Sequence, residues 1–215
     1  MNMRRLVPLS GIAFVALIVL SLAVGGGTPA SGASADEVAS FYGDDLARQF
    51  VSTFVLAASA PFVVLFGVGL ASSMSPGTGW SSAWRHVVLA GATLVAGTVL
   101  LSAFVHMAIV DGGDQGISPT ALQALNSLDG NTWIAFTSGL GVLLLGSAGA
   151  MLSAGSQRVL GWSALVLGVA LFLPFVDFIA MLASALWIIV VSVAIARGRE
   201  NDEAAVDGMA VPTGA

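Results

Sequence analysis

Residues 159–196 limit how this chain can fold more than any other stretch, because Asp177 is their only charged residue. A single α-helix of this length would extend for roughly 57 Å at a rise of about 1.5 Å per residue. The hydrocarbon core of a bilayer is about 30 Å thick and takes about 20 residues to cross. Pro174 interrupts a helix and Asp177 is costly inside lipid, so the stretch predicts two crossings joined by a turn at residues 173–177.

The composition excludes a water-soluble globular domain. The chain is 57% hydrophobic and only 9% charged, whereas soluble domains carry about 25% charged residues. Its 215 residues leave room for one membrane domain and no sizeable soluble one. The absence of cysteine excludes disulfides, thiolate metal sites and cysteine nucleophiles. The net charge of −5 and the lack of a basic cluster argue against a nucleic-acid partner.

The hydrophobic segments predict an all-α, polytopic integral membrane bundle of six transmembrane helices. These spans are expected at about residues 6–24, 50–71, 86–110, 133–153, 158–174 and 178–196. Together they would form one transmembrane domain over residues 1–199, followed by a disordered acidic cytoplasmic tail over residues 200–215. The first segment has two interpretations, a retained first helix or a signal peptide cleaved near residues 33–35.

Two loops between the spans carry signals for short helices. Ser34 and Glu37 have the spacing of a capping box, which predicts an amphipathic helix on the membrane surface that ends at Gly43. Ser118 followed by Pro119 predicts the start of a second short helix. Residues 129–131 are expected to end that second helix and to cap the fourth span.

The arginines predict the orientation of the bundle. If the chain has six spans, all but one of the arginines fall on the same side of the membrane. By the positive-inside rule this side is cytoplasmic, and both termini lie on it. Arg48 is the exception, and the arginines on the common side are Arg4, Arg5, Arg85, Arg158, Arg197 and Arg199. The acidic residues between the spans would make the outer face negative.

Small residues are expected to hold the helices together, because helices in lipid associate through close packing. Gly146, Ala150 and Ala154 have the required spacing in the fourth span. Replacing Gly146 by leucine should therefore weaken the fold more than it alters any chemistry.

His106 is the leading candidate for a functional side chain, and no catalytic, cofactor-binding or metal-site motif accompanies it. It could form an outer-face cluster with Asp111, Asp114 and Asp177 that senses pH or binds a metal ion. The alternative is a histidine bonded to a neighbouring backbone group or to Ser102, four residues earlier. Asp177 could instead cap the last span.

A second group of residues could line a polar route through the bundle. Pro61 should kink the second span, with Ser59 or a water molecule bonding the freed carbonyl. Thr98 and Ser102 would extend this polar lining along the third span. The alternative is that such hydroxyls bond the carbonyls of their own helices.

Several strings give the chain a resemblance to a known group. They are TP at residues 28–29, ADEVASFY at 35–42, ALQALNSLD at 121–129 and LGWSALVLG at 160–168. With these strings the chain resembles, over about residues 5–197, small six-span bacterial membrane proteins assigned to domains of unknown function. The resemblance implies the six-span topology and a bacterial plasma membrane location, and it carries over no catalytic residue.

Three functional hypotheses remain open on the sequence. The first is a non-enzymatic membrane component that acts through helix packing, as a homo-oligomer or with a membrane-protein partner. The second is a small permease or channel for a neutral or small solute. The third is a membrane enzyme or a pH or metal sensor built on His106 and the outer aspartates. No cofactor is expected in any of them.

Overall fold

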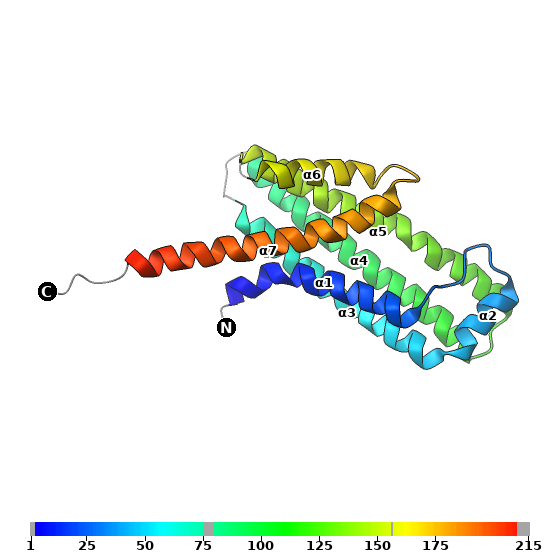
Figure 1. Cartoon of the computed structure of the whole chain (residues 1–215). Helices are drawn as coiled ribbons and strands as arrows, with labels where there is room; N and C mark the ends of the chain where they lie inside the picture. Colours follow the sequence, from blue (N-terminus) through cyan, green and yellow to red (C-terminus); the bar gives the residue numbers. More distant parts are fainter. Residues whose placement is uncertain (1–2, 75–79, 156, 210–215) are drawn as a thin grey trace.

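The computed structural model describes residues 3–74, 80–155 and 157–209. In those ranges the regular secondary structure is helical, with no strand. Figure 1 shows the long helices lying side by side and α2 lying at one end of them. The helices of the described ranges are α1 (Met3–Gly25), α2 (Ala35–Asp44), α3 (Leu46–Ser73), α4 (Trp80–Asp114), α5 (Pro119–Ser153), α6 (Arg158–Ala170) and α7 (Asp177–Met209).

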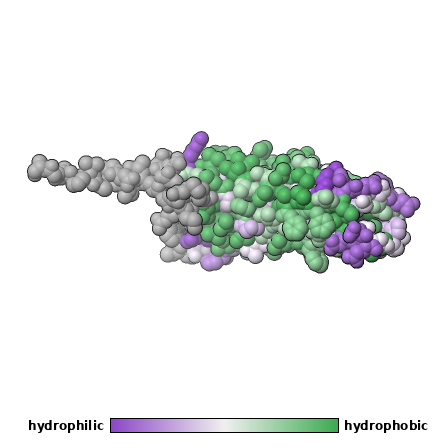
Figure 2. All heavy atoms as spheres, turned by 90° about the horizontal axis from the view of Figure 1, so that it is seen from below, coloured by the Kyte–Doolittle hydropathy of each residue, from purple (hydrophilic) through white to green (hydrophobic). Residues whose placement is uncertain are grey.

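The two ends of the bundle differ in charge. We call the end formed by α2, residues 26–34 and the α4–α5 connection the α2 end. We call the other end, which holds Arg85, Arg158 and Arg197, the arginine end. Figure 2 shows an apolar belt between them, with hydrophilic side chains gathered mainly at the α2 end. This surface is what a protein embedded in a bilayer presents.

Within the described residues, five helices are long and apolar enough to cross a membrane. The candidate spans are Val7–Gly25, Leu46–Ser73, Ser82–Asp114, Pro119–Ser153 and Asp177–Gly198. Helix α6 is also apolar but has only 13 residues, because the helix ends at Ala170 and not at residue 174. The prediction of an all-helical, multi-pass membrane bundle is confirmed at this level.

The predicted break at residues 129–131 is wrong, because α5 runs without interruption from Pro119 to Ser153. Asn131 and Thr132 bond carbonyls of the preceding turn, Asn131 Nδ2 to Ser127 O at 2.9 Å and Thr132 Oγ1 to Asp129 O at 2.7 Å. A Cβ at Gly130 would lie 2.9 Å from Ser31 Oγ. Glycine here therefore lets the 26–34 loop approach the helix.

Helix boundaries elsewhere also differ from the predictions. Helix α4 continues to Asp114, and Gly116 (φ +68°) follows its end in the left-handed conformation that glycine allows. Helix α7 continues to Met209, where a disordered tail over residues 200–215 was predicted; residues 210–215 lie outside the described residues. Both capping serines are as predicted, since Ser34 Oγ accepts from Glu37 N and Ser118 Oγ from Ala121 N.

Helix α2, which the sequence analysis placed on the membrane surface, packs its apolar face on the protein. Val38 and Tyr42, on its apolar face, are completely buried against the ends of α4 and α5. Ile109 and Leu122 supply much of that surface. The α4 and α5 extensions thus form, with α2, a second small core at the α2 end.

Glycines set the distance between α4 and α5. A Cβ at Gly146 would lie 2.8 Å from Val88 N, and one at Gly91 would overlap the backbone of Leu143. No heavy atom lies within 4 Å of the corresponding position at Gly97, also on α4. The predicted role of Gly146 in helix packing is confirmed, and Gly91 has the same role.

This difference predicts the outcome of a matched pair of substitutions on α4. Gly91→Ala should lower the free energy of unfolding by about 1–3 kcal/mol, because α4 and α5 must move apart. Gly97→Ala should leave it unchanged or raise it by up to about 1 kcal/mol, because alanine favours helix. Thermal unfolding of the two purified variants in the same detergent measures both effects. Equal effects of the two variants would contradict the close α4–α5 contact.

Candidate functional site

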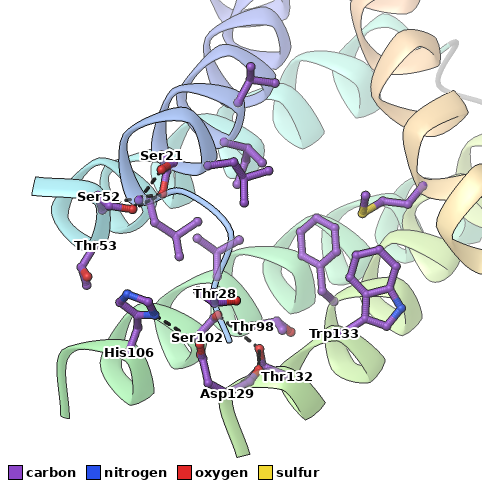
Figure 3. A pocket seen from close by; sticks show the side chains of 18 of the residues that line it. Ser21, Thr28, Ser52, Thr53, Thr98, Ser102, His106, Asp129, Thr132 and Trp133 are labelled. Carbon is purple, nitrogen blue, oxygen red and sulfur yellow. Dashed lines mark hydrogen bonds and ion pairs between the residues drawn. The ribbon is translucent and has the colours of Figure 1, made fainter. Parts of the chain in front are cut away.

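A cavity of about 400 Å³ lies at the α2 end between α1, α3, α4, α5 and α7. Its size falls within the range of about 300–1,000 Å³ that is usual for small-molecule sites. Figure 3 shows polar side chains gathered at one end of it. Apolar side chains form the rest of the wall, among them Phe14, Ile18, Leu56, Phe136, Leu140, Met181 and Ile188.

His106 lies at the polar end between two partners. Its Nδ1 is 3.2 Å from Asp129 Oδ2 on α5, and its Nε2 is 3.1 Å from Gln49 Oε1 on α3. The side chains of His106 and Asp129 are 11% and 14% exposed. The interaction joins α3, α4 and α5 through polar groups that are almost removed from solvent.

The orientation of Gln49 determines which protons His106 carries in this arrangement. Gln49 Nε2 donates to Gly25 O at 3.0 Å, so Oε1 is the atom that faces His106. Both ring nitrogens of His106 thus face acceptors. Nε2 of His106 is therefore the donor to Gln49 Oε1, and Nδ1 shares a proton with Asp129 Oδ2.

The same network closes the end of α1. Gly25 O accepts from Gln49 and also from Arg48 Nη2 at 2.9 Å, and Arg48 Nη1 lies 3.2 Å from Asp45 Oδ2. A cation at a helix C-terminus bonds the free carbonyls and interacts favourably with the helix dipole. Gly26 (φ +77°) then turns the chain away from the helix.

Ser21 and Ser52 bind α1 to α3 next to this point. Ser21 Oγ donates to Ser52 O, and Ser52 Oγ donates to Ser21 O, both at 2.9 Å. Both side chains are buried and line the cavity. Figure 3 shows this pair on the α1–α3 side of the cavity, across from Thr132 and Trp133.

Tyr42 covers the network from the α2 side. Its ring is in edge contact with His106 at 5.4 Å between centroids, and its hydroxyl donates to Asn126 Oδ1 at 3.3 Å. Asn126 Nδ2 in turn donates to the carbonyls of Pro29 and Ala30 in the 26–34 loop. Burial, and secondarily the negative charge of Asp129, raise the pKa of the Tyr42 hydroxyl far above its usual range.

Three hydroxyls complete the polar end of the cavity. The single proton of Thr132 Oγ1 is shared between Asp129 O at 2.7 Å and Ser102 Oγ at 3.2 Å, and Thr98 Oγ1 donates to Leu94 O at 2.9 Å. Ser102 thus bonds Thr132 on α5, whereas one interpretation of the sequence had paired Ser102 with His106. The hydroxyls of Thr98, Ser102 and Thr132 are available to a molecule held in the cavity.

The structure does not assemble the predicted cluster around His106. Asp111 and Asp114 are exposed farther along α4. Asp177 starts α7 and accepts from Trp133 Nε1 at 2.9 Å, while Asp129 occupies the place beside His106. No group of three or more potential metal ligands occurs in the ranges that the structure describes.

The predicted polar lining is only partly present. Thr98 and Ser102 line the cavity, whereas Ser59 is buried elsewhere and donates to Leu56 O at 2.7 Å. Pro61 lies inside α3, which continues past it to Ser73. Ser59 thus bonds the carbonyl one residue before the one that Pro61 leaves free.

Asp129 and Gln49 are the site residues that the sequence analysis missed. Asp129 was assigned to a helix end, and Gln49 lay just before the predicted second span. Periodicity offered a signal for Asp129: Leu122, Asn126, Asp129 and Trp133 lie on one face when residues 119–153 form a single helix. In comparisons with protein-family models, curated proteins and solved structures, nothing matches this chain.

The pairing of Asp129 with His106 predicts a difference between two aspartates. Asp129→Asn should lower the free energy of unfolding by about 1–3 kcal/mol, because the buried His106 loses a charged partner. Asp114→Asn, at an exposed position, should change it by less than about 0.5 kcal/mol. Chemical denaturation in detergent measures both values. A negligible effect of Asp129→Asn would show that the pair does not hold these helices together.

Tyr42 is the only tyrosine in the chain, so its ionisation can be followed in isolation. The folded protein should retain the Tyr42 proton above pH 10, at about which the unfolded chain loses it. The corresponding stability is therefore complete below about pH 10 and is lost as the pH rises further. Tyrosinate absorbance should show a midpoint near pH 10 only after denaturation. The same midpoint in the folded protein would contradict the burial of Tyr42.

Proposed function

We propose that this chain is a non-enzymatic, multi-pass membrane protein that binds an apolar or amphipathic molecule at its α2 end. The observation that carries the proposal is the cavity, whose wall is mostly apolar and whose polar groups gather at one end. A concave, largely apolar site with a few convergent polar groups is the usual form of a small-molecule site. Helix packing, the first hypothesis from the sequence, provides the frame of this site.

The route into the cavity supports a ligand that comes from the bilayer. Helices α1 and α7 meet where Gly11 approaches Ser192 and Ile188, and they diverge toward the α2 end (Figure 1). Val19 and Leu22 on α1 and Leu182 on α7 line the cavity and are also exposed. The cavity is therefore bordered by apolar side chains on the surface that would face lipid.

Conduction of a solute, the second hypothesis, has less support. Toward the arginine end the space between α3, α4 and α5 is filled by fully buried side chains, including Val63, Phe66, Val88, Leu143 and Leu144. In the part of the chain that the structure describes, this packing is apolar where a conducting path would continue from the cavity. The third hypothesis was a membrane enzyme or a pH or metal sensor using His106 and the outer aspartates. A metal site there would need ligands beyond His106 and Asp129.

For the topology we propose six crossings, with both termini in the cytoplasm of a bacterial cell. Helix α6 and residues 171–176 together carry the chain from Arg158 to Asp177, which bonds Trp133. The part of α5 from Trp133 to Ser153 is about 30 Å long, so the return path covers the thickness of a bilayer. Arg85, Arg158 and Arg197 then mark the cytoplasmic side.

Filling the cavity tests the binding function. Ala185 lines the cavity from α7, so Ala185→Phe should abolish the retention of a small molecule that copurifies with the wild-type protein. Ala135→Phe, at an exposed position on α5 outside the cavity, should retain it. Mass spectrometry of the intact proteins released from gentle detergent measures the bound mass. A bound mass that is absent from all three proteins, or equal in all three, would contradict the proposal.

Introduced cysteines test the topology, since the chain has none of its own. In intact cells a membrane-impermeant thiol reagent should label Asp114→Cys and Leu173→Cys, both of which are exposed. It should label Ser153→Cys and Gly198→Cys only after the cells are permeabilised. Labelling of the position at residue 173 only after permeabilisation would show that α6 does not cross.

A further inference from the structure

We infer that the ligand of this cavity is a neutral amphiphile, a single apolar chain that ends in a hydroxyl group. The inference rests on the proposed binding function and adds the chemical class of the ligand. It depends on three separate properties of the cavity: the charge of its lining, the hydrogen-bonding groups at its polar end, and its depth.

The lining offers no unpaired charge to a charged head group. His106 and Asp129 are the only titratable residues among those that line the cavity, and they bond each other, with His106 Nδ1 3.2 Å from Asp129 Oδ2. Arg48 on α3 and Asp45, which directly precedes α3, bond each other and are not among the lining residues. A carboxylate or an ammonium group would enter this apolar site without a counter-charge, which is strongly unfavourable.

The polar end fits a group that both donates and accepts a hydrogen bond. Ser102 Oγ faces the Thr132 proton, which also bonds Asp129 O, and among the described residues Ser102 donates no hydrogen bond of its own, which leaves its hydrogen to be donated. Asp129 lines the cavity, and its buried Oδ1 has no hydrogen-bond partner among the described residues. A hydroxyl that accepts from Ser102 and donates to Asp129 meets both conditions, because it carries one donor and two lone pairs.

The apolar part has the depth of one leaflet. From Asp129 to Leu140, both of which line the cavity, α5 extends for about 16 Å. Half of the hydrocarbon core of a bilayer is about 15 Å. From Gly25 to Phe14, α1 follows the same distance along the other wall. A lipid-like chain entering between α1 and α7 would thus lie at its usual depth with its head at the α2 end.

The test uses four probes that share one chain, brominated at its middle, and differ only in the head: alcohol, carboxylate, trimethylammonium or methyl. Bromine quenches tryptophan fluorescence, and Trp133 lines the cavity. Quenching that occurs in the wild-type protein but not in Ala185→Phe reports binding inside the cavity. The full-length protein in lipid nanodiscs is titrated with each probe.

The alcohol should reach half-maximal quenching at a concentration about tenfold below that of each other probe, as expected for hydrogen bonds that only a hydroxyl makes. Ser102→Ala should reduce this advantage over the methyl probe and leave the methyl probe's own affinity unchanged. Equal binding of the methyl probe would overturn the hydroxyl assignment, and tighter binding of the carboxylate or ammonium probe would overturn neutrality. If no probe binds while a molecule still copurifies, the ligand class is wrong but the binding function stands.

Discussion

Inside a bilayer, polar groups must find partners within the protein, and at the α2 end one chain of hydrogen bonds supplies them for the buried side chains, apart from Asp129 Oδ1. It runs from Gly25 O at the end of α1 through Gln49 to His106 and Asp129. Each step joins a different helix, so α1, α3, α4 and α5 are held together at one level. A buried network in which the members satisfy one another fixes a single arrangement of the helices.

This network also explains where the cavity lies. Close contacts through Gly11, Gly91 and Gly146 bring the helices together along the core, whereas at the α2 end α1 and α7 diverge. The polar network bounds the space between them toward the α2 end, and the packed core bounds it toward the arginine end. The ends of α4 and α5, covered by α2, shield the network from water. One molecule thus combines a closely packed bundle with an amphipathic cavity.

The sequence predicted the architecture better than the site. Long apolar segments are strong signals, so the all-helical membrane bundle, the two capping serines and the close packing at Gly146 were predicted correctly, whereas several helix boundaries were not. The site was not, because it depends on contacts between residues far apart in the chain, such as Gln49 with His106. Residues 129–131 resemble a helix end locally, but α5 continues through them because Asn131 and Thr132 bond the preceding turn and Asp129 has a partner on α4. Local propensity could not show that partner.

An experimental structure of the protein purified with its native lipids tests the central claim most directly. The account predicts elongated density between α1, α5 and α7, with its polar end within hydrogen-bonding distance of Ser102 and Asp129 and its tail reaching the level of Phe14 and Leu140. Side chains that close the space between α1 and α7, with His106 separated from Asp129, would contradict it.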